Sequence, residues 1–359
     1  YNHSKLLNKE KKKTIDLCAQ TYKQIRSQLK KRIVGLDEII EKLLISIFSG
    51  NHSLLVGVPG LAKTLLIKSL AELLNLKFSR IQFTPDLMPS DITGTEVLVQ
   101  DEYSKKREYN FLKGSVFANI ILADEINRTP PKTQSALLEA MEEHTVTTTG
   151  KTFKLDLPFF VLATQNPIEQ EGTYPLPVAQ LDRFMFNLLL DYPEKKNEHK
   201  IMRMTLSSDI EKLEPLLSKE QILNLLKIVY KLPVPKQIMN YIVNLVRYSR
   251  PQNPESPDFI RENLSWGASP RATQFLIIGG KALAVLKGRY QIRACDVREI
   301  MYPVMRHRII LNCQAEASGI SPDEIIDQLI STIPSPDHFS KKRKYRRYSQ
   351  KLYISVSNR

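Results

Sequence analysis

The sequence predicts an α/β fold, in which a parallel β-sheet lies between layers of helices and is followed by a smaller all-helical domain. In the first half of the chain, short apolar runs alternate with segments of helical spacing. Runs that are apolar at nearly every position are typical of strands buried on both faces of a parallel sheet. After Pro193 helical spacing dominates as far as Leu329, which predicts the second domain.

Four segments carry the strand prediction, at residues 53–56, 117–123, 159–163 and 184–190. Amphipathic helices are expected around Ile39–Ile47 and after Thr64, where apolar residues recur at helical spacing. We therefore divide the chain into a helical N-terminal segment (1–30), an α/β core (31–193), a helical domain (194–335) and a basic tail (336–359).

Composition restricts the class of protein. The chain has 359 residues, of which 42% are hydrophobic and 25% charged, as in ordinary globular proteins of about two domains. No apolar run approaches the ~18 residues of a membrane span, and no signal peptide is visible. Three cysteines without metal or redox spacing suggest free thiols in a reducing compartment, so a cytoplasmic location is expected. The six histidines form no zinc-binding pattern.

The net charge of +14 is concentrated at the C-terminus. Between Lys341 and Arg359 there are eight basic residues and no acidic ones. Such a run attracts nucleic acid, anionic lipid or an acidic protein, or it is a solvated tail that keeps the protein soluble.

A phosphate-binding loop is the clearest chemical motif. An apolar strand leads into a glycine-rich turn and then a helix, the context in which successive backbone N–H groups cradle phosphate oxygens. Lys63 is predicted to reach the β- and γ-phosphates of ATP, and the Thr64 hydroxyl to bind Mg²⁺. Ala62 replaces the usual second glycine, and its one added methyl can be accommodated if its φ stays negative. The predicted nucleotide site comprises Gly57, Val58, Pro59, Gly60, Leu61, Ala62, Lys63, Thr64 and Leu65.

Two further strand ends supply groups for hydrolysis. Asp124 and Glu125 follow the apolar residues 120–123, at the carboxyl edge of the sheet where ligands bind in such folds. Asp124 would hold the Mg²⁺ shell, and Glu125 would orient or deprotonate the attacking water. Asn166, after the third strand, would position that water. Taken alone, the residue is better explained by an Asx-turn before Pro167, but beside the two preceding motifs the functional role is favoured.

These motifs resemble the MoxR group of AAA+ ATPases. The matching phrases are residues 57–64, 124–134, 163–167 and 180–184, with a lid phrase at 267–272. The group also has alanine before the loop lysine. The resemblance covers residues 31–333 and implies an AAA+ P-loop NTPase core followed by a helical lid.

The resemblance also implies roles for single residues. Asn166 matches sensor 1, and Arg183 matches the arginine finger that reaches the nucleotide of a neighbouring subunit. Arg271 matches sensor 2, in the lid. Val34 and Gly35 lie where the family contacts adenine. A supplied arginine requires a neighbour, so the resemblance implies a homo-oligomer, a hexameric ring.

Two insertions fit the same group, at 83–115 and at 145–155, the second with a hairpin pattern around Gly150. In relatives they face the pore of the ring; alternatively they are exposed hairpins without a partner.

Three functions remain open from the sequence. The first is ATP-driven, chaperone-like remodelling of protein substrates, which in relatives include von Willebrand factor A domain partners. The second is a DNA-associated motor or transcription regulator, compatible with the sequence pI of about 9.5. The third is a non-catalytic scaffold gated by nucleotide, against which Glu125, Asn166 and Arg183 argue.

Overall fold

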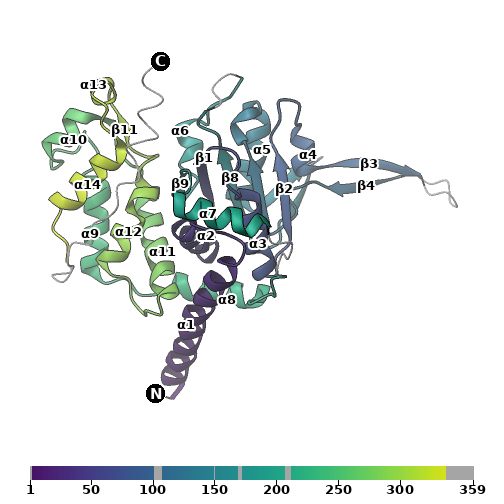
Figure 1. The fold of residues 1–359 in the computed structure, drawn as a ribbon, viewed down its shortest axis with the longest axis horizontal. Coiled ribbons are helices and arrows are strands. Elements are labelled where there is room, and N and C mark those ends of the chain that lie inside the picture. Colours follow the sequence, from purple (N-terminus) through teal and green to yellow (C-terminus); the bar gives the residue numbers. More distant parts are fainter. Residues whose placement is uncertain (1, 101–106, 149, 169–171, 207–211, 337–359) are drawn as a thin grey trace.

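The computed structural model describes residues 2–100, 107–148, 150–168, 172–206 and 212–336. Its centre is a five-stranded sheet in the order β2-β5-β8-β1-β9, in which every neighbouring pair is parallel. The helical lid lies beside the β9 edge of this sheet (Figure 1). The predicted α/β core and helical lid are thus confirmed.

The sheet contains one strand that the sequence pattern did not reveal. Its strands are β1 (Ser53–Gly57), β2 (Phe78–Gln82), β5 (Ile120–Asp124), β8 (Phe160–Gln165) and β9 (Phe186–Leu190). Four of these correspond to predicted segments. The missed strand, β2, is at the edge of the sheet and only Ile81 in it is buried, so it lacks the continuous apolar run expected of a central strand.

Alternate residues of the apolar strands enter two separate cores. On one face Leu55, Leu122 and Leu162 join a large cluster with the helices α2 (Asp37–Ser49) and α3 (Lys63–Leu73). On the other face Leu54 and Ile121 pack with the helix α5 (Pro131–Glu143). Because successive side chains of a strand point to opposite faces, a continuous apolar run is needed to fill both cores.

Two β-hairpins form the insertions. The strands β3 (Gly94–Gln100) and β4 (Arg107–Lys113) make an antiparallel arm that follows α4 (Pro89–Thr93) and projects far from the core (Figure 1). The predicted second hairpin is confirmed as β6 (Thr145–Thr148) and β7 (Lys151–Lys154). It supports the base of the arm, where Phe153 stacks on Phe111 at a ring-centroid distance of 4.1 Å.

The lid consists mainly of helices around the long α11. Its elements are α9 (Lys236–Arg247), α10 (Asp258–Asn263), β10 (Leu264–Trp266), α11 (Pro270–Leu286), α12 (Ala294–Met305), β11 (Ile310–Leu311), α13 (Cys313–Ala317) and α14 (Pro322–Thr332). The pair β10–β11 is a small antiparallel addition to the predicted helical domain. Shorter elements of the core are η1 (Ile126–Arg128) and α6 (Val178–Leu181).

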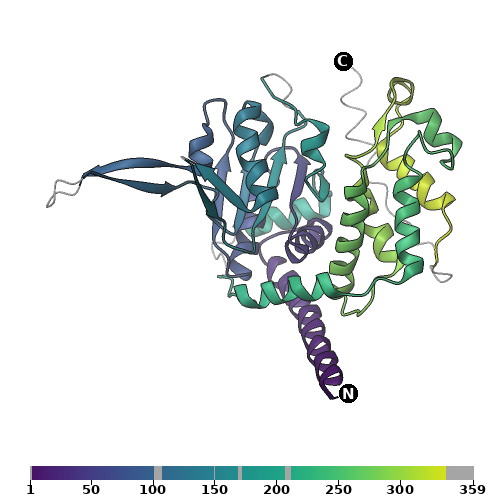
Figure 2. The same ribbon diagram turned by 180° about the vertical axis from the view of Figure 1, so that it is seen from behind.

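Three helices connect the α/β core and the lid. The helices α7 (Lys195–Leu206) and α8 (Lys219–Lys231) follow β9, and α8 contacts both α2 of the core and α11 of the lid. The N-terminal helix α1 (Asn2–Leu29) also contacts both parts, and its first turns extend beyond the body of the protein (Figure 2). One apolar cluster therefore includes residues of α1, the core and the lid.

A buried arginine of the lid binds the chain just before β9. Arg308 is only 3% exposed, and its guanidinium donates to the Asp182 side chain, to Asp182 O and to Phe184 O, each at 2.7 Å. Burial lowers the pKa of Arg308 to about 10, so the group remains a cation at neutral pH. A buried cation is tolerated only when it is paired and hydrogen-bonded, as Arg308 is.

The three cysteines, Cys18, Cys295 and Cys313, are free, as predicted. None of the described helices is long and apolar enough to cross a membrane. The predicted basic tail lies almost wholly outside the described residues.

The buried histidine His52 makes the fold sensitive to acid. Its Nδ1 accepts a hydrogen bond from Val161 N at 3.0 Å, so its Nε2 carries the proton and donates to Met141 O at 3.1 Å. Burial lowers the pKa of His52 to about 4, because the charged ring would be desolvated.

We expect this histidine to reduce stability as the pH falls from about 6.5 towards 4, where the unfolded chain binds a proton that the folded chain does not. His52 alone should lower the free energy of unfolding by about 3 kcal/mol over this pH range. Urea unfolding at several pH values should show a weaker pH dependence for His52→Gln than for the wild type. His199→Gln, which changes an exposed histidine of α7, is the control. An unchanged pH dependence in His52→Gln would contradict the assignment.

Candidate nucleotide site and a distant arginine pair

The phosphate-binding loop joins β1 to α3, and two of its glycines are required by the backbone. A Cβ on Gly57 would lie 2.7 Å from Leu190 O of the neighbouring β9. Gly60 has a φ of +83°, and a Cβ added to it would meet nothing within 4 Å, so conformation rather than space selects glycine there. The loop consequently lies close against the end of β9.

Ala62 does not have a negative φ, the condition under which we considered alanine acceptable at this position. It lies in the left-handed region, with φ 54° and ψ 24°, immediately before the first residue of α3. The turn from the loop into α3 therefore has a left-handed residue that is not glycine. A left-handed residue other than glycine costs about 1–2 kcal/mol, so the loop is strained at this point.

Lys63 links the loop to the acidic residues. Its Nζ donates to Gly57 O at 2.6 Å, which places the ammonium across the loop. Burial lowers the pKa of Lys63, while the charges of Asp124 and Glu125 oppose that shift. Thr64 is half-buried in the first turn of α3, and Leu65 is 41% exposed. The cation, the helix N-terminus and the backbone of the loop together suit an anionic ligand.

The hydroxyl of Thr164 joins the two acids at the end of β5. It donates to Asp124 Oδ1 at 2.6 Å and accepts from Glu125 N at 2.9 Å. The other oxygen of Asp124 accepts from Arg80 Nη2 at 2.7 Å. Adjacent strands thus fix the orientation of the carboxylate that we predicted as a metal ligand.

Glu125 also has a strained backbone, and its side chain is held by hydrogen bonds. Its φ of 57° is in the left-handed region. Its Oε2 accepts from Gln82 Nε2 at 3.0 Å and from Arg128 Nη1 at 2.9 Å. Strained residues held by surrounding hydrogen bonds are frequent at functional sites. Sequence reasoning missed Arg80 and Gln82 because it missed β2, whose place beside β5 brings both side chains to the acids.

Asn166 lies at the same edge of the sheet. It is 7% exposed, and its Oδ1 accepts from Ile168 N at 3.1 Å. This contact is the Asx-turn that the sequence left open as an alternative. The turn uses only the Oδ1 of Asn166, so the Nδ2 donor of the same amide still suits the predicted water-positioning role.

Val34 and Gly35 precede α2 on the side of the sheet where α7 begins. Gly35 has a φ of +80°, and a Cβ on it would lie 2.7 Å from Asn197 Nδ2. Asn197 was not among the predicted residues, although it lies in the first turn of α7, directly beside the segment expected to contact adenine.

Arg183 and Arg271 lie together, away from the other predicted residues. Arg183 Nη2 lies 3.0 Å from Glu142 Oε2, and Arg271 Nη2 lies 2.9 Å from Glu142 Oε1. Met185 N donates to His52 O, which places Arg183 at the amino-terminal end of β1. The phosphate loop leaves the opposite end, about 15 Å away at about 3.3 Å per strand residue. The two arginines therefore belong to a different face of the subunit from the loop.

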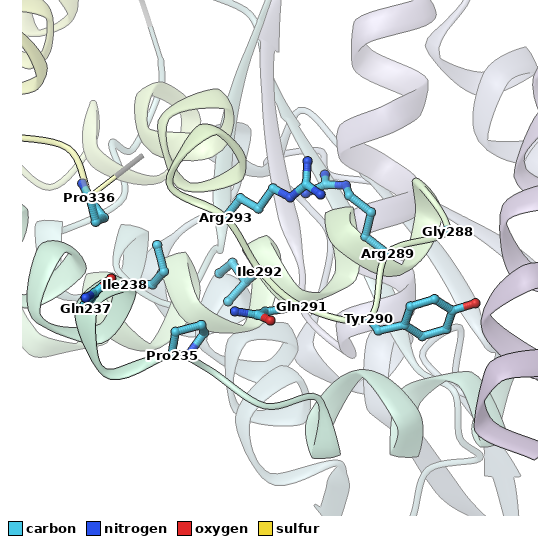
Figure 3. Close-up of a pocket in the computed structure, with 10 residues that line it drawn as sticks. All are labelled: Pro235, Gln237, Ile238, Gly288, Arg289, Tyr290, Gln291, Ile292, Arg293 and Pro336. Carbon is cyan, nitrogen blue, oxygen red and sulfur yellow. The ribbon is translucent and has the colours of Figure 1, made fainter. Parts of the chain in front are cut away.

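A cavity of about 580 Å³ lies within the lid and contains none of the predicted residues. It is formed by the start of α9, the connection from α11 to α12 and Pro336 (Figure 3). Tyr290 at its side points towards α1, where its hydroxyl donates to Asp16 Oδ1 at 2.6 Å. The cavity therefore belongs to the packing of the lid and α1 rather than to the nucleotide site.

The chemistry of the site suits Mg²⁺ delivered with a nucleotide. No cluster of three or more His, Cys, Asp or Glu side chains that could hold a metal occurs in the described part of the chain. Mg²⁺ in such sites usually takes only one or two protein oxygens and completes its shell with phosphates and water. The Thr64 hydroxyl and the Asp124 carboxylate are oxygen donors of the required kind.

The strain at Ala62 leads to a prediction. Ala62→Gly should raise the free energy of unfolding by about 1 kcal/mol, because glycine adopts the left-handed conformation without penalty. Thermal or urea unfolding measures the change. Ala71→Gly, further along the same helix, is the control and should lower stability instead. A destabilised Ala62→Gly variant would mean that the loop is not left-handed in solution.

Comparison with known proteins identifies the family. Residues 52–186 match the ATPase family associated with various cellular activities (AAA), and residues 259–329 match the AAA lid domain. Chaperone MoxR1 of Mycobacterium tuberculosis is 41% identical over 310 residues, which are 86% of this chain and 81% of that protein. YeaC of Bacillus subtilis is also 41% identical, over 85% of this chain and 91% of its own.

Two further relatives agree. Protein MoxR of Methylorubrum extorquens is 28% identical over 86% of this chain and 93% of its own. The crystal structure of a proposed ATPase from Cytophaga hutchinsonii superposes with a TM-score of 0.85 and 40% identity, covering 92% of this chain and 100% of that one. On these matches, the chain belongs to the MoxR family of AAA+ ATPases.

Proposed function

We propose that this protein binds ATP with Mg²⁺ and hydrolyses it to drive chaperone-like remodelling or maturation of a partner protein. The observation that carries the proposal is the convergence of Lys63, Asp124 and Glu125, with the ammonium in the field of both carboxylates. A cation for phosphate, an acid for the metal and an acid for water are the groups that phosphoryl transfer requires.

The residues divide the binding task between them. The backbone of residues 57–64 and the start of α3 would hold the phosphates, and Lys63 would exchange its bond with Gly57 O for the β- and γ-phosphates. Val34 and Gly35 would contact adenine. Thr64 and Asp124 would hold Mg²⁺, which neutralises charge on the phosphates when it is bound. Arg80 would have to yield one Asp124 oxygen or share it with the metal shell.

Glu125 and Asn166 would handle the attacking water. Glu125 would accept its proton or orient it, and the amide of Asn166 would hold it in line. The bonds from Gln82 and Arg128 to Glu125 restrain the carboxylate, so part of that restraint must be released for it to act as a base.

Arg183 and Arg271 would complete the site of a neighbouring subunit. They lie at the edge of the sheet opposite to the loop, so we expect them to be out of reach of a nucleotide bound by their own chain. This position supports action in trans for both residues, in a ring such as AAA+ proteins generally form, with a hexamer as our proposal. A head-to-tail interface that closes into a ring gives every subunit one complete site.

The partner is proposed to be a protein. The relative named as a chaperone supports this class, and von Willebrand factor A domain proteins are the first candidates on the family resemblance. We place the protein in the cytoplasm, in keeping with its free cysteines.

The role of Glu125 can be tested by substitution. Glu125→Gln should bind ATP as tightly as the wild type and lose turnover by about 10²–10⁴-fold, because the amide cannot accept a proton. A phosphate-release assay and equilibrium binding of a fluorescent ATP analogue measure the two effects. Undiminished hydrolysis would refute the assignment. The same variant with ATP should trap the partner in a pull-down.

The arginines can be tested in the same way. Arg183→Ala and Arg271→Ala should each lower kcat, for Arg183 by ~10³-fold, while monomer affinity for ATP stays unchanged. Arg261→Ala, which changes an arginine of α10 in the lid, is the control. A large loss of nucleotide affinity in the monomer would show that the arginine acts within its own subunit.

A further inference from the structure

We propose that Glu142 is a positioning residue, which holds Arg183 and Arg271 together as one unit for the nucleotide of the neighbouring subunit. This inference rests on the proposed function, because it assumes that both arginines act in trans. It adds a residue in the last turn of α5, which neither the sequence motifs nor the comparisons single out.

The geometry of the group is that of a shared carboxylate. Each carboxylate oxygen of Glu142 forms an ion pair with one guanidinium. Arg183 Nη2 lies 3.0 Å from Oε2, and Arg271 Nη2 lies 2.9 Å from Oε1. Arg183 is fixed by a second bond, from its Nη1 to Leu138 O at 2.8 Å on the same helix. The side chains of Arg183, Arg271 and Glu142 are 31%, 35% and 40% exposed, so the group is accessible from outside.

Charge explains why a carboxylate is needed at this point. Two guanidinium groups brought this close repel each other, and one negative charge between them removes most of that cost. The group keeps a net charge of about +1. Each guanidinium has five N–H donors, and the bonds to Glu142 and Leu138 use only some of them. The remaining donors can bind phosphate oxygens while Glu142 stays in place.

Glu142 also connects the arginines across the junction between core and lid. Arg183 precedes β9 in the core, whereas Arg271 is in the first turn of α11 in the lid. Asp182 supports the same junction, because it accepts hydrogen bonds from Ser269 and from the buried Arg308. The junction should therefore survive the loss of Glu142, while the relative position of the two guanidinium groups should not.

A structural role and a positioning role predict different results. An exposed ion pair contributes little to stability, so Glu142→Gln should fold with nearly the wild-type melting temperature. Arginines displaced from the reacting phosphate lose much of their effect, since catalysis depends on the geometry of the charged groups.

The first experiment compares kinetics in the full-length protein. Glu142→Gln should lower kcat by ~10-fold or more, with KM for ATP and the oligomeric state unchanged. Glu139→Gln removes an exposed carboxylate from the same helix and should behave as wild type. Glu142→Asp, which keeps the charge, should recover part of kcat. Wild-type kcat in Glu142→Gln, or an increase, would overturn the inference; an increase would mean that Glu142 restrains the arginines rather than presenting them.

The second experiment mixes subunits to separate positioning in trans from a defect within the subunit. Glu142→Gln chains keep an intact Glu125, and Glu125→Gln chains keep an intact arginine pair. Random 1:1 co-assembly leaves about one quarter of the interfaces with both, so the mixture should be more active per subunit than either variant alone. If the mixture shows no more than the average of the two separate activities, the inference fails.

The two proposals can fail separately. If Arg183→Ala and Arg271→Ala keep wild-type kcat, the trans role of the arginines in the proposed function is wrong, and the inference about Glu142 falls with it. If both lose activity while Glu142→Gln does not, the proposed function stands and only the inference about Glu142 is wrong.

Discussion

The contact between Arg308 and Asp182 determines where the lid sits relative to the sheet. A guanidinium that is almost fully buried must satisfy its donors within the protein, and it does so on the chain just before β9. Asp182 in turn accepts from Ser269, which N-caps α11. One buried cation thus joins the core strand, the residue next to Arg183 and the helix that carries Arg271. Breaking these bonds while the charge stays buried is strongly unfavourable.

The length of a strand separates the two halves of the chemistry. At the carboxyl edge of the sheet, the loop, Asp124, Glu125 and Asn166 lie close together, and Thr164 connects the two acids. At the amino edge, Arg183 and Arg271 share Glu142. A side chain cannot span the length of a strand, so one chain presents the candidate nucleotide site at one edge of the sheet and a pair of cations at the other. Under the proposed function, assembly would bring the arginine pair of one chain to the phosphate loop of the next.

The candidate nucleotide site combines a strained backbone with hydrogen-bonded side chains. Ala62 and Glu125 both have left-handed backbones without being glycine. The three charged side chains of the site have hydrogen-bond partners within the protein. Lys63 donates to Gly57 O, and Asp124 accepts from Thr164 and from Arg80. Glu125 accepts from Gln82 and from Arg128. Contacts within the chain therefore keep the charged groups of the candidate site oriented. Under the proposed function, these contacts would have to be exchanged for phosphates and a metal or shared with them.

The sequence by itself determined the α/β core, the helical lid, the phosphate loop and the acids, because each depends on local patterns: apolar runs, turn residues and polar residues at strand ends. It did not reveal β2, since an edge strand lacks the continuous apolar run, and so it missed Arg80 and Gln82. The sequence allowed alanine at position 62 on the condition of a negative φ, but the turn into α3 gives Ala62 a positive φ, against the preference of alanine. The meeting of Arg183, Arg271 and Glu142 was decided only by the tertiary structure, because it joins three elements distant in sequence through the docking of the lid.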